Sequence, residues 1–282
     1  MRRRLESASV LYLTLVGLFI LPSLLPPTVQ IALLNKLLHR DLANPVHQTN
    51  LDLHYHLRET PQQPEEATSL GCDTSFFAID HGHIFTPKDS TIHKPLSAEQ
   101  ALGKKLRWMT LGGQYDWTTK RYPLEAPPRF PEDIGHFLKG LFPDVDAQAA
   151  IVNLYSPGDT LSVHRDVSEE CDRGLISLSI GCEGIFILGN DDGSQTAAVR
   201  LRSGDAVLMT GASRFAWHAV PKVIPDTCPE WLRDWPSITE ATPGYGKWRG
   251  WMKSKRINVN VRQMSDRQSS SATASSWHNE PE

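Results

Sequence analysis

Cysteine is scarce in this chain of 282 residues, which contains only four copies. Cys72, Cys171, Cys182 and Cys228 form no C-x-x-C pair and show no zinc-ligand spacing, so neither a zinc finger nor a dithiol redox site is predicted. We expect free thiols in a reducing compartment. This indicates a protein of the cytoplasm or the nucleus, with the mitochondrion as the alternative because arginines follow the first methionine.

An excess of positive charge is also missing. The 29 basic and 32 acidic residues give a net charge of −3, which argues against a protein that coats nucleic acid through its overall charge. An enzyme that binds nucleic acid locally remains compatible with this balance. Hydrophobic residues make up 40% of the chain, which is enough for one large domain or for one domain with an appended N-terminal part.

A long apolar run is absent too. The apolar stretch at residues 10–21 ends at Pro22 and is shorter than the ~20 residues that a membrane span needs. No stable membrane partner is therefore expected. Two interpretations of residues 1–22 remain, a targeting segment or folded structure. The apolar spacing over residues 29–38, with Thr28 as a candidate N-cap, favours a folded strand and helix.

The segment NLYSPGDTLSVHRD at residues 153–166 contains the main candidate for a metal site. His164 and Asp166 lie two residues apart at the end of an apolar run, and side chains two apart on a strand share a face. The pair could therefore bind one metal ion. His218, in SRFAWHAVP, is the candidate third ligand, which predicts a facial triad of two histidines and one carboxylate.

The tripeptide H-x-D is not specific by itself, because residues 39–41 have the same letters, HRD, as residues 164–166. The first copy follows IALLNKLL, which predicts an amphipathic helix, where residues i and i+2 diverge. We interpret that copy as polar residues at the surface. HRD also occurs in the catalytic loop of protein kinases, but Cys171 stands where that loop needs Asn and no G-x-G-x-x-G precedes it.

The segment RINVNVR at residues 256–262 alternates polar and apolar side chains. Arg256, Asn258, Asn260 and Arg262 therefore share one face. That face could be exposed to solvent. It could also point into a barrel, where buried arginines are unfavourable unless a ligand with carboxylates compensates them. Because six strand residues span about 20 Å, the two arginines must serve different ends of such a site.

From residue 149 onward, turns rich in Gly, Asp and Pro separate short runs with strand character. Residues 130–142 predict an amphipathic helix between two prolines. The segment 222–251 is predicted to be a lid or a surface loop, and the aromatic and basic residues at 245–255 fit a nucleic-acid rim or a surface loop equally well. Eight antiparallel strands are predicted, in a double-sheet jelly roll, at residues 151–155, 161–166, 175–180, 185–188, 197–201, 206–209, 215–220 and 257–261.

Taken together, these motifs resemble the AlkB family of Fe(II)- and 2-oxoglutarate-dependent nucleic-acid dioxygenases. The patterns NxYxPGDxLxxHxD, SRxxxHxVP and RxNxNxR occur in family order, and LRWMTLGGQYDWTTKRY and GLFILPSLLPPTVQIALL are similar to the homologue-1 branch. The resemblance implies an α+β fold with a double-stranded β-helix (jelly-roll) core, N-terminal helices and a nucleotide-recognition lid. Residues 1–105 would form the N-terminal strand, helix and lid loops, 106–264 the dioxygenase domain, and 265–282 a disordered tail.

The resemblance also implies cofactors and the residues that bind them. Fe(II) would be held by His164, Asp166 and His218, with 2-oxoglutarate and O2 as cosubstrates. Arg256 matches the family arginine that pairs with the far carboxylate of 2-oxoglutarate. The full set implied to bind 2-oxoglutarate is Asn153, Tyr155, Arg256, Asn258 and Arg262.

The reaction implied by the resemblance is the oxidative removal of N-methyl groups from bases in DNA or tRNA, methylated adenine above all, by a monomer. Trp117 and Tyr122 match the loop that covers a base taken out of its stack. Ser168 stands where the bacterial prototype has a second carboxylate, so bacterial substrate contacts are not expected. Two other hypotheses remain: a 2-oxoglutarate-dependent protein hydroxylase or demethylase, and a non-catalytic jelly-roll binding module.

Overall fold

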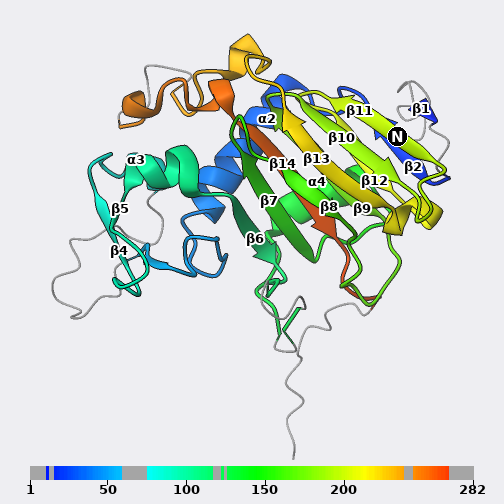
Figure 1. Cartoon of the computed structure of the whole chain (residues 1–282), viewed down its shortest axis with the longest axis horizontal. Coiled ribbons are helices and arrows are strands. Elements are labelled where there is room, and N and C mark those ends of the chain that lie inside the picture. The colour runs from blue at the N-terminus through cyan, green and yellow to red at the C-terminus, as the bar shows by residue number, and fades with distance from the viewer. Residues whose placement is uncertain are drawn as a thin grey trace, which may run out of the picture.

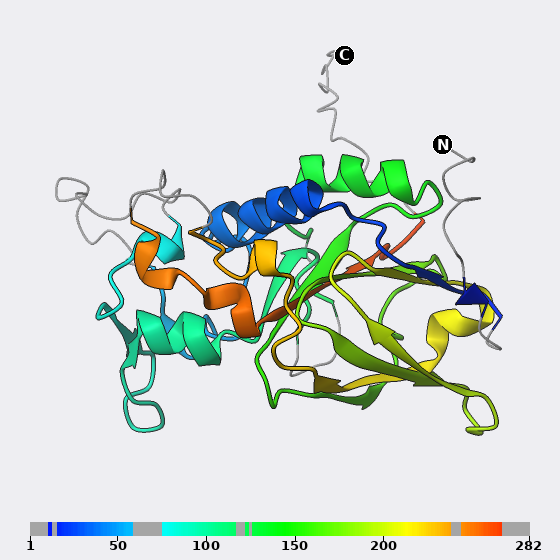
Figure 2. The ribbon, with the colours of Figure 1, turned by 90° about the horizontal axis from the view of Figure 1, so that it is seen from above.

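The computed structural model of the chain describes residues 11–12, 16–58, 75–116, 122–123, 126–237 and 244–266. Two antiparallel sheets face each other, and helices cover the outer face of the larger sheet (Figure 1 and Figure 2). The jelly-roll architecture predicted from the strand pattern is confirmed. The predicted tail beyond residue 266 and the predicted substrate residue Trp117 lie outside the described residues.

The larger sheet has seven strands in the order β1-β2-β12-β9-β14-β7-β6. β14, which follows all the others in the chain, pairs antiparallel with both β9 and β7. Because its backbone is hydrogen-bonded on both sides, the sheet sets the direction of every side chain on β14. The strands are β1 (Leu11–Tyr12), β2 (Leu18–Leu21), β6 (Trp108–Gly112), β7 (Ala149–Tyr155), β9 (Leu175–Gly181), β12 (Ala206–Met209) and β14 (Arg256–Arg262).

The smaller sheet has four strands in the order β11-β10-β13-β8. They are β8 (Leu161–His164), β10 (Gly184–Gly189), β11 (Thr196–Leu201) and β13 (Trp217–Val223). All eight predicted strands are therefore present, with two differences at their ends. Asp166 lies beyond the end of β8, and Phe215 belongs to the short 3-10 helix η4 (Gly211–Phe215) that precedes β13.

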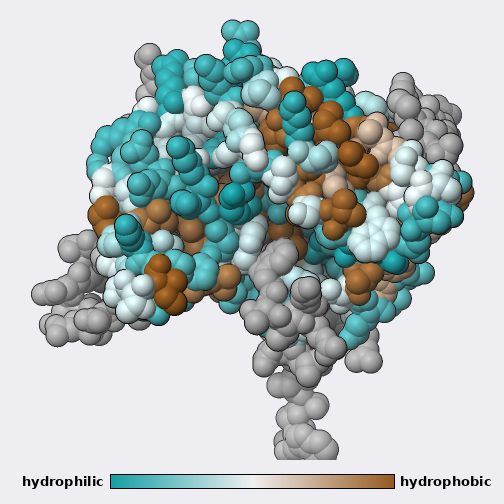
Figure 3. Space-filling view, in the orientation of Figure 1, coloured by the Kyte–Doolittle hydropathy of each residue, from teal (hydrophilic) through white to brown (hydrophobic). Residues whose placement is uncertain are grey.

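An apolar core lies between the two sheets. In the described part of the chain no helix covers the outer face of the smaller sheet, where apolar residues gather (Figure 3). Val163, Ile187 and Trp217, on three of its strands, are 65%, 39% and 39% exposed. The buried residues of the inner cluster are Leu18, Ile20, Leu175, Phe186, Leu188, Leu201, Val207, Met209, Ala216 and Val220.

Two helical segments pack on the outer face of the larger sheet. The first is α2 (Pro27–Leu34), which continues as the π-helical turn η1 (Asn35–Asp41), and the second is α4 (Glu132–Leu141). The helix begins at Pro27, with Pro26 at the N-cap position, so the prediction of Thr28 as N-cap was wrong. Proline suits the first turn of a helix because the N–H groups there have no intrahelical partner.

The folded interpretation of the N-terminal segment is confirmed from residue 18 onward. β2 pairs with β12 through four register positions, and the apolar face of the following helix is buried against the sheet. Leu33, Leu34, Leu37 and Leu38 are each at most 4% exposed. Within the described residues, no helix combines the length and the apolar character that crossing a bilayer requires.

In the first HRD copy, His39-Arg40-Asp41, the surface prediction is confirmed for the exposed Arg40 and wrong for Asp41, while His39 is half-buried. Asp41 is only 2% exposed, and Arg40 pairs with both Asp41 and Asp133. Because Asp133 belongs to α4, the pair between Arg40 and Asp133 connects the two helical segments. The copy belongs to no group of metal-ligand donors among the described residues.

A small three-stranded sheet lies beside the larger one. It consists of β3 (Tyr55–His56), β4 (Ile84–Pro87) and β5 (Leu96–Ser97) and leads into the helical turns α3 (Ala98–Gln100) and η3 (Ala101–Lys105). An isolated bridge between Thr49 and Met109 connects the chain before β3 to β6. The small sheet and the helical turns that follow it therefore adjoin the edge of the larger sheet (Figure 1).

The segment between β13 and β14 contributes an aromatic cluster to the core. It contains the short 3-10 helices η5 (Glu230–Leu232), η6 (Gly246–Trp248) and η7 (Trp251–Ser254). Phe77 meets the rings of Trp235, Trp248 and Trp251 at centroid distances of 5.1, 5.5 and 5.1 Å. With Trp248 and Trp251 only 5% and 8% exposed, both predictions for residues 245–255, a nucleic-acid rim and a surface loop, were wrong for these tryptophans.

The turn between β9 and β10 depends on a glycine. Gly181 has φ +94°, and a Cβ there would lie 2.3 Å from the Lys255 carbonyl oxygen, whereas Gly158 has φ +91° and open space around it. We expect Gly158→Ala to lower the free energy of unfolding by about 1–2 kcal/mol through backbone strain alone. Gly181→Ala should cost about 2–5 kcal/mol, because the clash adds to the strain. Urea denaturation of both variants tests this, and equal losses would contradict it.

Candidate active site

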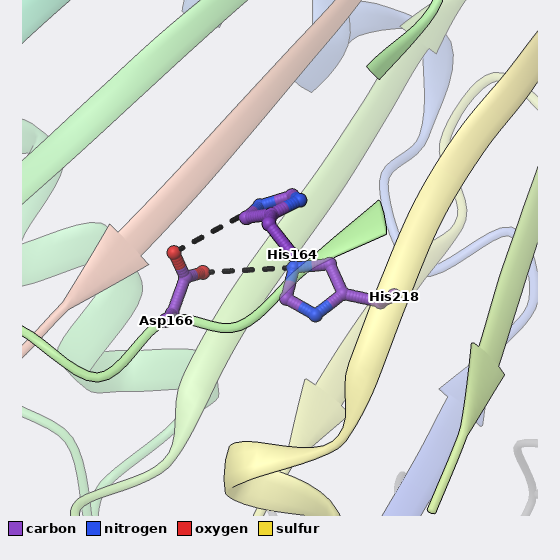
Figure 4. A group of neighbouring side chains, drawn as sticks. All are labelled: His164, Asp166 and His218. Atoms are coloured by element: carbon purple, nitrogen blue, oxygen red, sulfur yellow. Dashed lines mark ion pairs between the residues drawn. The ribbon is translucent and has the colours of Figure 1, made fainter. Parts of the chain in front are cut away.

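The predicted metal ligands converge where the smaller sheet meets β14. His164 ends β8 and lies directly opposite His218 on β13, as a register pair. Asp166 follows two residues later, in the loop after the strand, so the expectation that strand alternation alone aligns it with His164 was wrong. Its carboxylate nevertheless lies on the same side as both imidazoles (Figure 4).

The geometry of the three side chains suits a metal ion. Asp166 Oδ2 lies 3.7 Å from His218 Nε2, and Asp166 Oδ1 lies 4.0 Å from His164 Nε2. One donor atom from each residue falls within 4.8 Å of the others. No other such group of three His, Cys, Asp or Glu residues occurs in the described ranges.

Backbone carbonyls select the tautomer of each histidine. Nδ1 of His164 lies 2.9 Å from the Ser162 carbonyl oxygen, and Nδ1 of His218 lies 3.0 Å from that of Ala216. A carbonyl only accepts, so Nδ1 carries the proton and donates it. Nε2 then presents a lone pair on the side that faces Asp166, which is the arrangement found for metal-bound histidine.

Asp166 is held as a carboxylate. Burial alone would raise its pKa, but Arg262 and the two histidines outweigh burial and lower the pKa to about 2. Arg262 Nη2 donates to Oδ1 at 2.8 Å, and Asn260 Nδ2 donates to Oδ2 at 3.4 Å. The group is therefore ionised at neutral pH, as a metal ligand must be.

The polar face of β14 points between the two sheets. Arg256, Asn258, Asn260 and Arg262 are 1%, 8%, 8% and 4% exposed, while the alternate residues pack on the helix side. The interior interpretation of the RINVNVR pattern is confirmed, and the solvent-facing alternative was wrong. Burying charged side chains in such a position raises the free energy of the folded state unless groups of opposite charge pair with them.

Arg262 is compensated by groups of this chain. Besides Asp166, its Nε lies 3.3 Å from Glu169 Oε1, an ion pair without a hydrogen bond, and its Nη1 donates to the Tyr122 hydroxyl at 3.2 Å. Burial would lower the pKa of Arg262, but Asp166, Tyr122 and Glu169 raise it above the ordinary value. The contact also brings the predicted substrate residue Tyr122 to the edge of the metal-ligand cluster.

Arg256 has no such compensation within the described residues. Its guanidinium donates to Ser179 Oγ at 3.0 Å and to the Cys182 carbonyl at 3.4 Å, while its Nε has no partner there. Burial lowers the pKa of Arg256 to about 10. The Tyr155 hydroxyl, on the register partner of Arg256, also lacks a partner in that part of the chain.

Arg256 and Tyr155 lie side by side on neighbouring strands and form a candidate second subsite. A buried donor without an acceptor is unfavourable by about 1–3 kcal/mol, more for a charged group, so the pair suits a ligand with a carboxylate. Asn153 and Asn258 are register partners one step closer to the metal-ligand cluster on the same face. The structure thus brings together all the predicted ligand-binding residues that it describes.

Two residues of the site were missed at the level of sequence. Glu169 and Arg214 are 2% and 1% exposed by side chain and form a 2.9 Å ion pair behind Asp166. Arg214 stands in the motif SRFAWHAVP, so a buried arginine near the metal could have been inferred there. Nothing in the local pattern distinguishes Glu169 from an exposed loop glutamate.

Comparisons with known proteins agree with this site. The family model described as "2OG-Fe(II) oxygenase superfamily" matches residues 72–262. The chain is 52% identical over 267 residues to the N6-methyladenosine RNA demethylase ALKB1 of Pyricularia oryzae, covering 89% of this chain and 75% of that protein. It is 41% identical over 260 residues to the tRNA demethylase abh1 of Schizosaccharomyces pombe, covering 88% and 79%.

Two further relatives are more distant. The chain is 34% identical over 200 residues to the nucleic acid dioxygenase ALKBH1 of Homo sapiens, covering 63% of this chain and 50% of that protein. The solved structure of OsALKBH1 aligns with a TM-score of 0.53 at 20% identity, covering 90% of this chain and 99% of that chain. At this identity the structural likeness supports the fold.

The different environments of the two arginines lead to a stability prediction. In the ligand-free protein, Arg256→Met should leave the free energy of unfolding unchanged or raise it by up to about 2 kcal/mol, because it removes a buried charge without a counter-charge. Arg262→Met, the matched control on the same strand, should lower it by about 3–5 kcal/mol, because two carboxylates lose their partner. Chemical denaturation measures both. Equal destabilisation would mean that Arg256 is already compensated.

Proposed function

Because the chain belongs to the 2OG-Fe(II) oxygenase superfamily, and within it to the AlkB homologue-1 branch, we propose that it oxidatively removes N-methyl groups from adenine in RNA. The observation that supports this most directly is the arrangement of two subsites in one interior. A His-Asp-His cluster lies at one end of the β14 polar face, and an arginine without a counter-charge lies at the other.

The residues present fit the cofactors that the family uses, Fe(II), 2-oxoglutarate and O2. The two Nε2 lone pairs and the ionised carboxylate are the donor set of a facial triad, which leaves other positions of the ion open. When bound, iron would activate O2 as the oxidant while 2-oxoglutarate gives up two electrons and is decarboxylated to succinate and CO2; one oxygen atom of O2 goes to succinate and the other hydroxylates the N-methyl carbon, after which formaldehyde leaves and the unmodified base remains.

The residues of the chain orient these partners. His164, Asp166 and His218 hold the iron, and Arg256 with Tyr155 binds the far carboxylate of 2-oxoglutarate, which supplies the acceptors that both side chains lack. Arg262 keeps Asp166 ionised and fixed. The apolar cluster between the sheets excludes bulk water from the interior next to the site.

The relatives support RNA as the substrate class, and the net charge bears on how the protein would bind it. The two fungal relatives above are named for RNA and tRNA, and with a net charge of −3 the protein must bind such a polyanion locally. In our proposal the modified base leaves its stack to reach the iron. Tyr122, beside Arg262, and Trp117 would then contact that base, and the protein would act as a monomer.

A protein hydroxylase with the same cofactors is the second candidate, because nothing in the overall charge favours nucleic acid. The two candidates differ in the substrate that stimulates turnover. A non-catalytic module differs from both, since it would bind metal without forming succinate.

The activity test compares three substrates at equal concentration. With Fe(II) and 2-oxoglutarate, we expect release of formaldehyde and succinate with an N6-methyladenosine RNA oligonucleotide, less with the DNA equivalent, and none with a methylated peptide. His218→Ala should reduce the rate at least about 100-fold, the upper end of what altered outer contacts of a metal site cost. His136→Ala is the matched control, because that side chain on α4 is 77% exposed. Stimulation by the peptide alone would refute the nucleic-acid assignment.

A further inference from the structure

We propose that Glu169 is a positioning residue for the metal-binding carboxylate and acts through two buried arginines. The proposal rests on the iron site of the proposed function and adds to it a residue that coordinates nothing itself. The observation behind it is a chain of alternating charges, Arg214, Glu169, Arg262 and Asp166, in which no side chain is more than 10% exposed.

Glu169 uses each carboxylate oxygen for a different arginine. Oε2 accepts from Arg214 Nη2 at 2.9 Å, and Oε1 lies 3.3 Å from Arg262 Nε. Both arginines then reach Asp166 from different directions. Arg262 Nη2 donates to the side-chain oxygen Oδ1 at 2.8 Å, and Arg214 Nη1 donates to the Asp166 backbone carbonyl at 2.9 Å.

Asp166 needs such support because no sheet holds it. β8 ends at His164, and residues 165–174 form neither helix nor strand. Arg214 also anchors the backbone further along this loop, because its Nε donates to the Arg173 carbonyl at 2.8 Å. The contacts of Arg214 and Arg262 therefore replace the ladder of hydrogen bonds that fixes His164 and His218.

The contact with Glu169 also limits how Arg262 can bind Asp166. A free guanidinium would pair with a carboxylate through two parallel hydrogen bonds and occupy both oxygens. In this structure Nε faces Glu169 and Nη1 faces Tyr122, so Nη2 alone donates to Asp166. The second oxygen, Oδ2, accepts only the 3.4 Å bond from Asn260, lies on the side of His218 and has a lone pair left for the metal.

The test measures metal binding separately from folding. Glu169→Gln keeps the shape of the side chain but removes its charge and presents an NH2 group to one of the arginines. Co(II), added without 2-oxoglutarate, serves as the probe of metal binding. We expect the Kd for Co(II) to rise about 10–100-fold, with an altered visible spectrum because the geometry of the carboxylate changes. Thermal unfolding of the metal-free protein is recorded alongside.

Glu183→Gln is the matched control. Glu183 also bridges two arginines, Arg200 and Arg202, but on the outer side of the β9–β10 turn, and its side chain is 15% exposed. This variant should bind Co(II) like the wild type. If Glu169→Gln does not fold, Glu169→Asp, which keeps the charge but shortens the reach, is measured by the same criterion.

The outcomes distinguish the two proposals. If the wild type fails to bind Co(II), the iron site itself is refuted, and the proposed function fails with it. If the wild type binds and the Glu169 variant that folds has the same Kd and spectrum, only the role of Glu169 is refuted. A loss of affinity that Glu183→Gln shares would likewise refute it. Weaker binding in the Glu169 variant alone supports the proposal.

Discussion

The burial of four polar side chains from one central strand is the constraint on which the rest of the structure depends. β14 lies between β9 and β7, so its alternation must send one set of side chains towards the helices and the other into the sandwich. The apolar set faces the helices, which leaves Arg256 and Arg262 in an interior where charge is costly. The two sheets, the loop after β8 and the metal-ligand cluster are arranged around these two groups.

The two arginines differ in how the unfavourable free energy of burying their charge is offset. Arg262 is paired with Asp166 and Glu169, so its charge is neutralised without a ligand and can hold the Asp166 carboxylate ionised. Arg256 has only neutral acceptors among the described residues. In the proposed function a diacid would bind at the Arg256 end of the strand, which would couple the stability of the interior to occupancy by a ligand. The same strand would then supply one charge that holds the metal-ligand carboxylate and one that recognises the cosubstrate.

The two HRD tripeptides show how far local sequence can be trusted. Both contain the same letters, and in both an arginine pairs with the aspartate, yet Asp41 pairs with the neighbouring Arg40, which connects two helices through Asp133, and Asp166 belongs to a metal-ligand cluster. Turn residues rich in Gly, Asp and Pro predicted the eight strands because they bound short apolar runs, and alternation predicted the polar face of residues 256–262. It did not predict that β8 stops before Asp166, nor that Trp248 and Trp251 are buried, because both depend on neighbours distant in the chain.

By itself, the sequence determined the strand pattern, the polar face of β14, and, through the resemblance of its ordered motifs, the three metal-ligand residues and the residues proposed to bind the cosubstrate. These are local or nearly local properties, since each follows from the spacing of residue types along a few positions. The tertiary structure alone decided which way that polar face points and which arginine has a counter-charge. It also decided that Glu169 and Arg214 stand behind Asp166. Such properties require contact between segments about 50–100 residues apart in the chain, because the free energy of a buried charge depends on the charges and dipoles beside it.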